Sequence, residues 1–524
     1  MHQFLVSAAH KSSGKTSLSI GLAAELSRQG RAVQTFKKGP DYIDPMWLAA
    51  ATGRPCRNLD FNVSTPQQLQ LEFALHGARA DVCLAEGNHG LYDGLDIEGT
   101  NSNAALARLL DLPVVLVLDA RGMTRGIAPL ILGYQAFDRS IRIAGVILSR
   151  LGGARHETKL RAVIEHYTDV PVLGAMHEDP SLAIAERHLG LTPACEVDVA
   201  QGRIAALAAA VAKEVDLERL LAATIGVAPA RTPPAGTGAR VPQELSLQAG
   251  SRPLVAPQRQ SRQAESKPLV APQGLSRQAG SRPLVVPRGL SLVVPQGLPL
   301  VVGVARDRAF GFYYADDLEA LERAGAELQF FDTLRDARLP RVDALIVGGG
   351  FPEVFMRELE ANAALRGEIL TAINAGMPAY AECGGLMYLA RSLSWRGDTR
   401  RMVGAIPGDV VMHQRAVGRG YVRLARTAAH PWQDRNDREL EIPAHEFHHS
   451  SIQGLASNTR FAYRVARGFG VDGKSDGIVV NNLLANYSHL RSAGSYDWAA
   501  QFVAFARRCT EEQNAMALPL SAVY

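Results

Sequence analysis

The chain has 524 residues, of which 47% are hydrophobic and 21% charged, and a formal net charge of +4. This composition is typical of a globular protein with two or more domains. No apolar run approaches the ~20 residues of a membrane helix, and the first residues, MHQFLVSAAHKSSGK, do not resemble a signal peptide. Five cysteines without a C-x-x-C pair argue against a disulfide framework or a zinc site. We expect a cytoplasmic protein that binds neither membranes nor nucleic acid.

The first ~225 residues alternate short apolar runs with helical stretches. Near-continuous apolar strands alternating with helices predict a parallel sheet covered on both faces, an α/β fold. The strand-like runs are 4–6, 82–85, 113–118 and 143–148, and helix-like stretches include 16–29 and 103–110.

A phosphate loop is expected after the first strand, in the sequence AHKSSGKT. The usual pattern is G-x-x-x-x-G-K-[ST], and here Ala9 replaces its first glycine. Backbone N–H groups at the start of the next helix would hold phosphates, Lys15 would reach the outer phosphates, and Thr16 would face Mg²⁺. The predicted ATP-binding residues are Ser12, Ser13, Gly14, Lys15 and Thr16.

Three carboxylates accompany the loop. Asp41 and Asp44 lie in the Gly-Pro turn of KKGPDYIDP, and Glu86 ends the strand DVCLAE. Ligands bind at the carboxyl edge of open parallel sheets, and paired carboxylates near phosphates commonly hold Mg²⁺. Each acid alone could equally be a solvated turn residue, but together they favour a site for ATP and Mg²⁺.

Residues 226–298 differ in composition. Three near-copies, QAGSRPLVAPQ, QAESKPLVAPQ and QAGSRPLVVPR, repeat every 15 residues from Gln248. Such a period also occurs in solenoids, but each copy contains two prolines and no aromatic residue. We therefore expect a flexible, low-complexity linker.

A second α/β unit is predicted from residue 299. Its strands are 300–305 and 342–347, its helices 316–324 and 368–375, and a closing helix follows residue 497. The second strand ends in Gly348-Gly349-Gly350, which is a tight turn or an oxyanion hole formed by Gly349 and Gly350, since close backbone approach needs glycine.

The stretch YAECGGL places Cys383 between a strand and a helix. A cysteine there is either a buried small hydrophobe or a nucleophile activated by the helix N-terminus and a base. Histidines of this unit include the HEFHH cluster of His445, His448 and His449, for which metal binding is the alternative role.

Ten segments resemble the cobyrinic acid a,c-diamide synthase family over both units. They are KKGPDYIDP, ATGRPCRNLD, EGNHGLYDG, VVLVLDARG, AGVILSRLGGARH, ERHLGL, VGGGFPE, AECGGLMYL, HEFHHS and NLLANYSHL. The resemblance implies a P-loop, dethiobiotin synthetase-like domain for residues 1–225 and a class I glutamine amidotransferase-like domain for residues 299–524.

The resemblance also implies the chemistry. ATP activates peripheral carboxylates of a modified tetrapyrrole as acyl phosphates, and glutamine supplies the nitrogen. Cys383 would be the nucleophile, His489 its base, Asp41 a neighbour of the activated carboxylate, and Thr16, Asp44 and Glu86 the Mg²⁺ site. No tightly bound organic cofactor is expected, and a homodimer is left open.

One position departs from the class I pattern. The glutamate that usually follows the catalytic histidine by two residues is Arg491 here. We therefore interpret the pair as a Cys–His dyad, and what orients the imidazole stays open. Expected substrate contacts are Tyr42, Asp93, Arg415 and Tyr421.

The macrocycle is not fixed by these motifs. We place the a and c side chains of cobyrinate or hydrogenobyrinate first, as in cobalamin biosynthesis. Asn88, Asp96 and the pair 102–103 resemble relatives that amidate sirohaem, which is the alternative substrate. A non-catalytic ATP-dependent switch is a more distant alternative, disfavoured by the presence of both Cys383 and His489.

Overall fold

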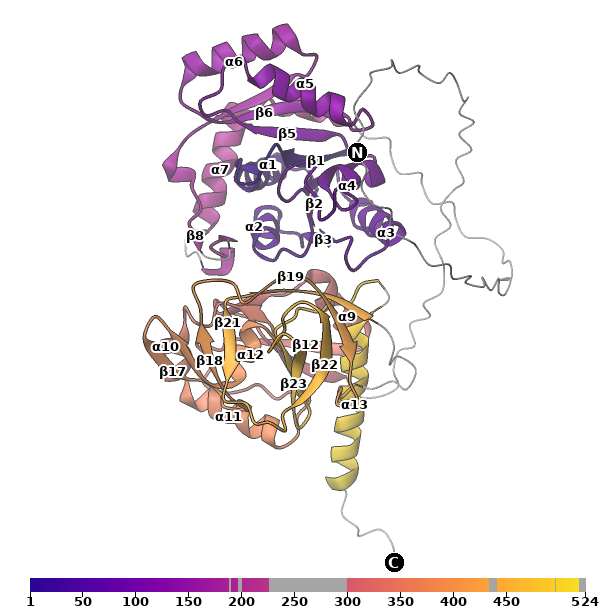
Figure 1. Cartoon of the computed structure of the whole chain (residues 1–524), viewed down its shortest axis with the longest axis vertical. Coiled ribbons are helices and arrows are strands. Elements are labelled where there is room, and N and C mark those ends of the chain that lie inside the picture. The colour runs from indigo at the N-terminus through magenta and orange to yellow at the C-terminus, as the bar shows by residue number, and fades with distance from the viewer. Residues whose placement is uncertain (188–189, 197–199, 226–298, 433–440, 495, 518–524) are drawn as a thin grey trace, which may run out of the picture. The chain divides into compact units, whose positions relative to one another are not determined.

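The computed structural model describes residues 1–187, 190–196, 200–225, 299–432, 441–494 and 496–517 (Figure 1). The repeat segment 226–298, for which we expect a linker, lies outside these residues. The described residues on either side of this segment form one compact unit.

The first half contains a seven-stranded sheet in the order β3-β2-β4-β1-β5-β6-β7. All its pairings are parallel. Its strands are β1 (His2–Ala8), β2 (Val33–Lys38), β3 (Arg57–Leu59), β4 (Val82–Glu86), β5 (Val114–Asp119), β6 (Ile143–Leu151) and β7 (Val172–His177).

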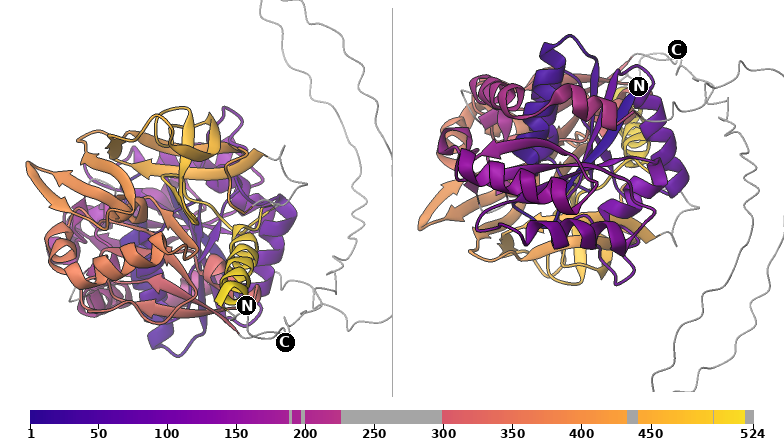
Figure 2. Two further views of the ribbon diagram at one scale, coloured as in Figure 1. Left: turned by 90° about the horizontal axis from the view of Figure 1, so that it is seen from below. Right: turned by 90° about the horizontal axis from the view of Figure 1, so that it is seen from above.

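Helices lie on two sides of these strands, as the right-hand view in Figure 2 shows. They are α1 (Lys15–Arg28), α2 (Ile43–Thr52), α3 (Pro66–Gly77), α4 (Asn103–Leu110), α5 (Ile127–Phe137), α6 (Ala154–Tyr167), α7 (Ala200–Glu214) and α8 (Leu217–Ala223). Short elements η1 (Pro180–Leu182), β8 (Glu186–Arg187), β9 (Gly190–Leu191) and η2 (Ala194–Glu196) precede α7.

The two faces of this sheet form two separate hydrophobic cores. Successive side chains of a strand point to opposite faces, so Phe4 and Val6 of β1 pack with α1 and α7, whereas Leu5 packs with α3 and α4. Burial on both faces explains why the strands are apolar without alternation.

The second half contains a nine-stranded mixed sheet in the order β12-β10-β13-β15-β24-β23-β22-β19-β20. Its strands are β10 (Leu300–Ala305), β12 (Ala326–Phe331), β13 (Ala344–Val347), β15 (Ala379–Glu382), β19 (Gly418–Arg426), β20 (Glu441–His448), β22 (Arg460–Arg467), β23 (Ser475–Val480) and β24 (Leu483–Asn486). The strands from β12 to β24 are parallel, and the remaining pairings are antiparallel.

Smaller elements complete this half. A four-stranded sheet runs β17-β16-β18-β21, and β11 pairs with β14. Their bounds are β11 (Phe310–Phe312), β14 (Gly349–Gly350), β16 (Ala390–Trp395), β17 (Asp398–Arg401), β18 (Ile406–Met412) and β21 (Ser450–Gln453). The helices are α9 (Ala315–Arg323), α10 (Met356–Ala361), α11 (Ala363–Asn374), α12 (Gly384–Leu389) and α13 (Trp498–Ala517).

The predicted α/β fold class is confirmed in both halves, and every strand and helix named from the sequence is present within a few residues. The strands from β16 to β23, whose pairings are mostly antiparallel, were not predicted. Within the described part of the chain, the search for a helix long and apolar enough to span a membrane finds none.

Candidate active sites

The sharpest turn of the second half lies at Cys383, between β15 and α12. Cys383 has φ 47° and ψ −100°, a backbone conformation that L-residues rarely adopt. Its N–H donates to the carbonyl oxygen of Asn486 on the neighbouring strand at 2.7 Å. Strained backbone of this kind persists only where the surroundings fix it, and it clusters at functional sites.

The two glycines that follow allow the turn to pack against the Gly348–Gly350 loop. A Cβ on Gly385 would lie 2.0 Å from the carbonyl oxygen of Val347, and one on Gly384 would lie 2.9 Å from the amide nitrogen of Gly350. Atoms cannot approach so closely, so both positions exclude a side chain. The glycines therefore hold the predicted oxyanion loop directly beside the nucleophile.

His489 is the imidazole brought to this turn. It follows β24, and its backbone is bridged to His445 of β20 by N–H···O bonds of 2.7 and 3.3 Å. Its ring hydrogen-bonds Cys383. Nδ1 lies 3.3 Å from Oε2 of Glu382 and 3.1 Å from the hydroxyl of Tyr42. The predicted Cys383 and His489 are thus brought together.

Electrostatics favour a charged imidazole here. Burial lowers the pKa of His489, but hydrogen bonds from the ring to Cys383 and Glu382, together with the charges of these two groups, outweigh it and raise the pKa to about 10. An opposite charge within a few ångström stabilises the protonated form. The site can therefore hold a proton on His489.

Gly349 lies against the same imidazole. A Cβ there would be 2.8 Å from Cε1 of His489, and the N–H of Gly348 donates to the hydroxyl of Tyr313 at 2.8 Å. The Gly348–Gly350 loop thus contacts both the imidazole of His489 and the strand-to-helix turn at Cys383, which we call the elbow. This placement agrees with the candidate oxyanion residues Gly349 and Gly350 without testing their role.

The HEFHH histidines serve different partners. The His445 ring stacks on His489 with centroids 4.8 Å apart, and burial lowers its pKa well below the usual value. The His448 ring stacks on Tyr487 at 4.0 Å. Among the described residues, the one group of three or more His, Cys, Asp or Glu side chains close enough to share a metal ion is Glu72, His76 and Asp316, which contains none of these histidines.

Arg491 occupies the position where class I enzymes carry a glutamate. Its guanidinium pairs with Asp316 at 2.9 Å and lies 4.3 Å from the centroid of the Tyr314 ring. The side chain of Arg491 therefore contacts α9 and the residue that precedes this helix, rather than the imidazole. The nearby Glu382, which sequence reasoning did not single out, supplies a carboxylate instead.

The phosphate loop joins β1 to α1 as predicted. Gly14 adopts a left-handed conformation with φ 85° immediately before the helix begins at Lys15. The Ser13 hydroxyl donates to the carbonyl of His10 at 2.8 Å, and Lys15 Nζ donates to the same carbonyl at 3.4 Å. Burial and the charge of Lys37 lower the pKa of Lys15 to about 8.

The predicted metal residues converge at the carboxyl ends of β2 and β4. Thr16 donates to Oε1 of Glu86 at 2.7 Å and to Oδ2 of Asp44 at 3.3 Å. Lys37, which sequence reasoning missed, donates to the same two oxygens, at 3.0 Å to Glu86 and 2.6 Å to Asp44. Parallel pairing of β2 with β4 sets Lys37 opposite Glu86.

These residues fit a magnesium ion. Hydroxyl and carboxylate oxygens are the hard donors that Mg²⁺ takes beside phosphates. Oε2 of Glu86 is buried without a hydrogen-bond partner in the described part of the chain. Burial raises the pKa of Glu86, while Lys37 opposes the rise. A cation would relieve both the unpaired oxygen and the unfavourable desolvation.

Asp41 lies beside this cluster and caps α2. Its Oδ1 accepts from the N–H of Ile43 at 2.9 Å and of Asp44 at 3.2 Å. Burial and the charge of Asp44 raise its pKa to about 7, against the opposing effect of Lys37. The carboxyl is therefore poised to exchange a proton near neutral pH.

The four expected substrate contacts differ in surroundings. Oδ2 of Asp93 accepts from the N–H of Gly90 at 2.8 Å, and its charge acts on Lys15. Arg415 is exposed. The hydroxyl of Tyr421 donates to Asp60 at 2.9 Å. Tyr42 is buried, with its ring stacked 5.2 Å from that of Phe312.

The residues that suggested sirohaem organise a turn. Asn103 donates to the carbonyls of Asn88 and Gly90 at 2.5 and 3.0 Å. Ser102 caps α4 through the N–H of Ala105 at 3.0 Å. These contacts give Asn103 and Ser102 a role in the structure of the turn itself.

Comparisons with known proteins agree with both sites. Residues 5–191 match the family model of the CobQ/CobB/MinD/ParA nucleotide binding domain, and residues 301–495 match that of the CobB/CobQ-like glutamine amidotransferase domain. A phosphate loop and a cysteine elbow in one chain define a ligase that forms C–N bonds with glutamine as the nitrogen donor.

The chain belongs to the cobyrinate a,c-diamide synthase family. It is 40% identical to the cobyrinate a,c-diamide synthase of Magnetococcus marinus, over 96% of this chain and 97% of that protein. The proteins of the same name from Methanosarcina acetivorans and Methanosarcina barkeri are 37% and 36% identical, over 95% and 96% of this chain and 94% and 96% of their own lengths.

Proposed function

We propose that the protein uses ATP and glutamine to amidate peripheral carboxylates of a modified tetrapyrrole, with the a and c side chains of cobyrinate as the first candidates. The observation that carries the proposal is the presence of both half-sites in one chain. Beside the phosphate loop, Thr16 hydrogen-bonds both Asp44 and Glu86. At the elbow, Cys383 hydrogen-bonds His489. The shared name of the relatives supports the macrocycle.

In the glutaminase half, the Cys383 thiolate attacks the side-chain carbonyl carbon of glutamine. The C–N bond breaks as His489 gives its proton to the departing nitrogen, so ammonia leaves and a glutamyl thioester remains. Water then hydrolyses the thioester to glutamate and regenerates the thiol. Backbone N–H groups of Gly349 and Gly350 would stabilise the oxyanion of each tetrahedral intermediate.

In the synthetase half, a carboxylate oxygen of the substrate attacks the γ-phosphate of ATP, forming an acyl phosphate and ADP. Ammonia then attacks the acyl carbon, and phosphate leaves as the amide forms. Lys15 and the loop N–H groups hold the phosphates, and Asp41 accepts the proton that the attacking ammonia loses. Mg²⁺ held by Thr16, Asp44 and Glu86 would neutralise charge on the transferred phosphoryl group.

The test is incubation of the protein with glutamine, ATP and Mg²⁺ and, separately, cobyrinate, hydrogenobyrinate and sirohaem. Mass spectrometry detects the exchange of a carboxyl OH for NH₂. Two exchanges on cobyrinate or hydrogenobyrinate are expected. Amidation of sirohaem alone would keep the reaction and replace the substrate. Persistent ATP hydrolysis with every macrocycle unchanged would contradict the amidation.

A further inference from the structure

We infer that Glu382 is the positioning residue of the glutaminase site, taking the place of the carboxylate that Arg491 cannot supply. This inference rests on the glutaminase half of the proposed function. Its geometry, its own hydrogen bonds and the tautomer that it imposes on His489 all support it.

The strand register brings Glu382 to the imidazole. β15 pairs with β24 in parallel, with Glu382 opposite Asn486, three residues before His489. Adjacent residues at the end of β15 therefore reach the same ring: Oε2 of Glu382 lies 3.3 Å from Nδ1, and the thiol of Cys383 hydrogen-bonds the ring. The nucleophile and the carboxylate are neighbours in the sequence.

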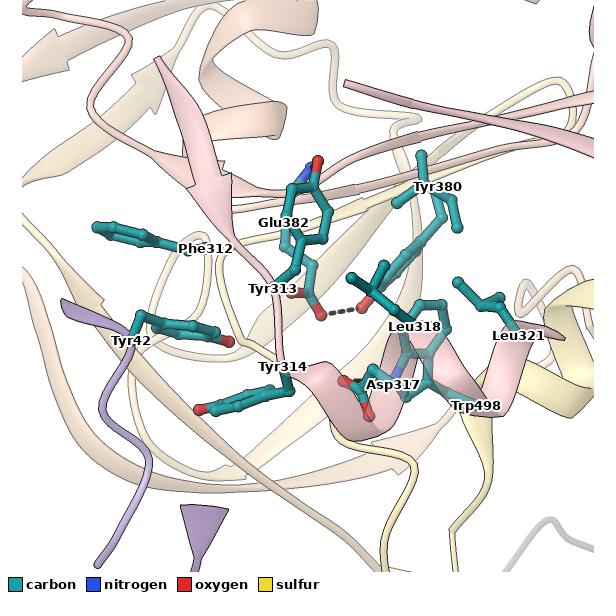
Figure 3. A pocket seen from close by; sticks show the side chains of 12 residues that line it. Tyr42, Phe312, Tyr313, Tyr314, Asp317, Leu318, Leu321, Tyr380, Glu382 and Trp498 are labelled. Carbon is teal, nitrogen blue, oxygen red and sulfur yellow. Dashed lines mark hydrogen bonds between the residues drawn. The ribbon is translucent and has the colours of Figure 1, made fainter. Parts of the chain in front are cut away.

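The Glu382 carboxylate is held in place by donors from two other residues. Oε1 accepts the hydroxyl of Tyr380, shown by the dashed line in Figure 3, and the N–H of Leu490 at 2.8 Å. Asn486 in turn donates to the Tyr380 hydroxyl at 3.2 Å and to the carbonyl of Ser488 at 2.6 Å. The side chain is 9% exposed as part of a buried network, so its orientation is fixed before glutamine binds.

The carboxylate selects the tautomer that the chemistry needs. An ionised carboxylate can only accept, so Glu382 stabilises the N–H on Nδ1. The other ring nitrogen, Nε2, is then free to take the thiol proton and later to give it to ammonia. A triad glutamate two residues after the histidine would act on the ring in the same way.

Tyr42 is the rival partner of Nδ1, with its hydroxyl 3.1 Å away. A hydroxyl can also donate, and donation to Nδ1 would leave the proton on Nε2, which then cannot accept from the thiol. The opposite preferences of the two partners make them distinguishable by experiment. The titratable or charged groups around Glu382 and His489 are Cys383, Tyr42, Tyr313, Tyr314, Asp317, Tyr380, His445 and Arg491.

The experiment measures glutamine hydrolysis by the full-length protein without macrocycle, as kcat and KM from pH 5 to 10. Glu382→Gln is expected to lower kcat by about 10²- to 10⁴-fold with little change in KM, because the amide supports either tautomer. The alkaline limb of the pH profile should move to lower pH, because the imidazolium loses its counter-charge. Glu382→Asp should restore part of kcat and should return the alkaline limb part of the way to its original pH.

Two variants separate positioning from mere structure. Asp476 is a buried carboxylate that accepts from the N–H groups of Tyr487 and Ser488 at 3.0 and 2.9 Å, in the same loop as His489. Asp476→Asn should lower the thermal midpoint without moving the pH profile. Tyr42→Phe removes the rival partner of Nδ1, so the alkaline limb of its pH profile should stay where it lies in the parent protein.

Two outcomes would overturn the inference. One is an unchanged pH profile in Glu382→Gln. The other is a fall in kcat of about 10²- to 10⁴-fold in Tyr42→Phe without such a fall in Glu382→Gln. Amidation driven by ammonia should survive in Glu382→Gln, which shows that the chain is folded. If no macrocycle is amidated while the glutaminase results hold, the proposed substrate fails and the inference stands.

Discussion

The two sites lie at the carboxyl ends of parallel strands, yet they are built from opposite materials. The phosphate-loop site is a cluster of charged side chains, in which Lys37 lies between Asp44 and Glu86. The elbow site is formed by close backbone approach, with Gly384 and Gly385 pressed against the Gly348–Gly350 loop. Under the proposed function, the first would be completed by nucleotide and metal, whereas the second would need only glutamine. We therefore expect that a substitution in one site will impair the reaction of that site and leave the reaction of the other intact.

Replacing the nucleophile should give the largest effect. Cys383→Ala is expected to lower glutamine-dependent amidation on the order of 10³-fold or more, because the thioester cannot form. Amidation driven by free ammonia should remain near its original rate. Parallel assays with the two nitrogen donors measure both. Loss of the ammonia reaction would contradict the separation of the sites.

Removing the phosphate-loop lysine should give the converse pattern. Lys15→Ala is expected to lower amidation by about 10²- to 10³-fold with either nitrogen donor, because charge on the transferred phosphoryl group loses a buried partner. Glutamine hydrolysis without ATP should persist. Lys11→Ala changes an exposed lysine of the same loop and is the matched control, expected to retain amidation.

A single methyl group should damage the elbow. Gly385→Ala places a Cβ 2.0 Å from the Val347 carbonyl oxygen, and relief of such a clash costs about 1–3 kcal/mol. The thermal midpoint and glutamine hydrolysis should both fall. Gly367 in α11 has no atom within 4 Å of its added Cβ, so Gly367→Ala should raise the midpoint slightly. Equal effects of the two would refute the packing argument.

The pH dependence of the synthetase half should be the smallest effect. The pKa of Asp41 is raised to about 7, so ammonia-driven amidation at fixed free ammonia should rise with pH through 7 as the carboxylate forms. Asp41→Asn should be slower and flat across that range. A rise that persists in the variant would assign the titration to another group.

The same carboxyl also links stability to pH. Because the folded protein binds the Asp41 proton more tightly than the unfolded chain does, its contribution to stability falls as pH rises from about 4 to 7. Asp41→Asn should therefore raise the thermal midpoint more at pH 8 than at pH 4. An equal gain in thermal midpoint at both pH values would mean that the pKa of Asp41 is not raised in the folded protein.

Local patterns were sufficient to predict four strands of the first sheet (β1, β4, β5 and β6), the phosphate loop and the elbow. Each is written in consecutive residues whose spacing reflects one element or one turn. Lys37 and Glu382 escaped prediction because their roles depend on which strands are neighbours: β2 beside β4 and β15 beside β24. Both residues stand at or next to the last position of a buried strand that leads into a turn, and that position is the signal that could have found them.

The strands from β16 to β23 were missed for a related reason. They mix buried and exposed positions irregularly, as in β19 and β22, so no simple alternation marks them. His445 shows the consequence: the HEFHH motif is typical of a metal cluster by composition, but strand geometry directs its histidines to separate partners.

The ammonium group of Lys37 has a consequence for the order in which the synthetase site fills. As a built-in counter-ion, it keeps two neighbouring carboxylates from repelling each other while no ligand is bound. A divalent ion arriving alone must compete with that resident charge. When the ion arrives together with a triphosphate, Lys37 gains new anionic partners and can release its carboxylates. We therefore expect metal and nucleotide to bind cooperatively, with weak metal binding in the absence of ATP.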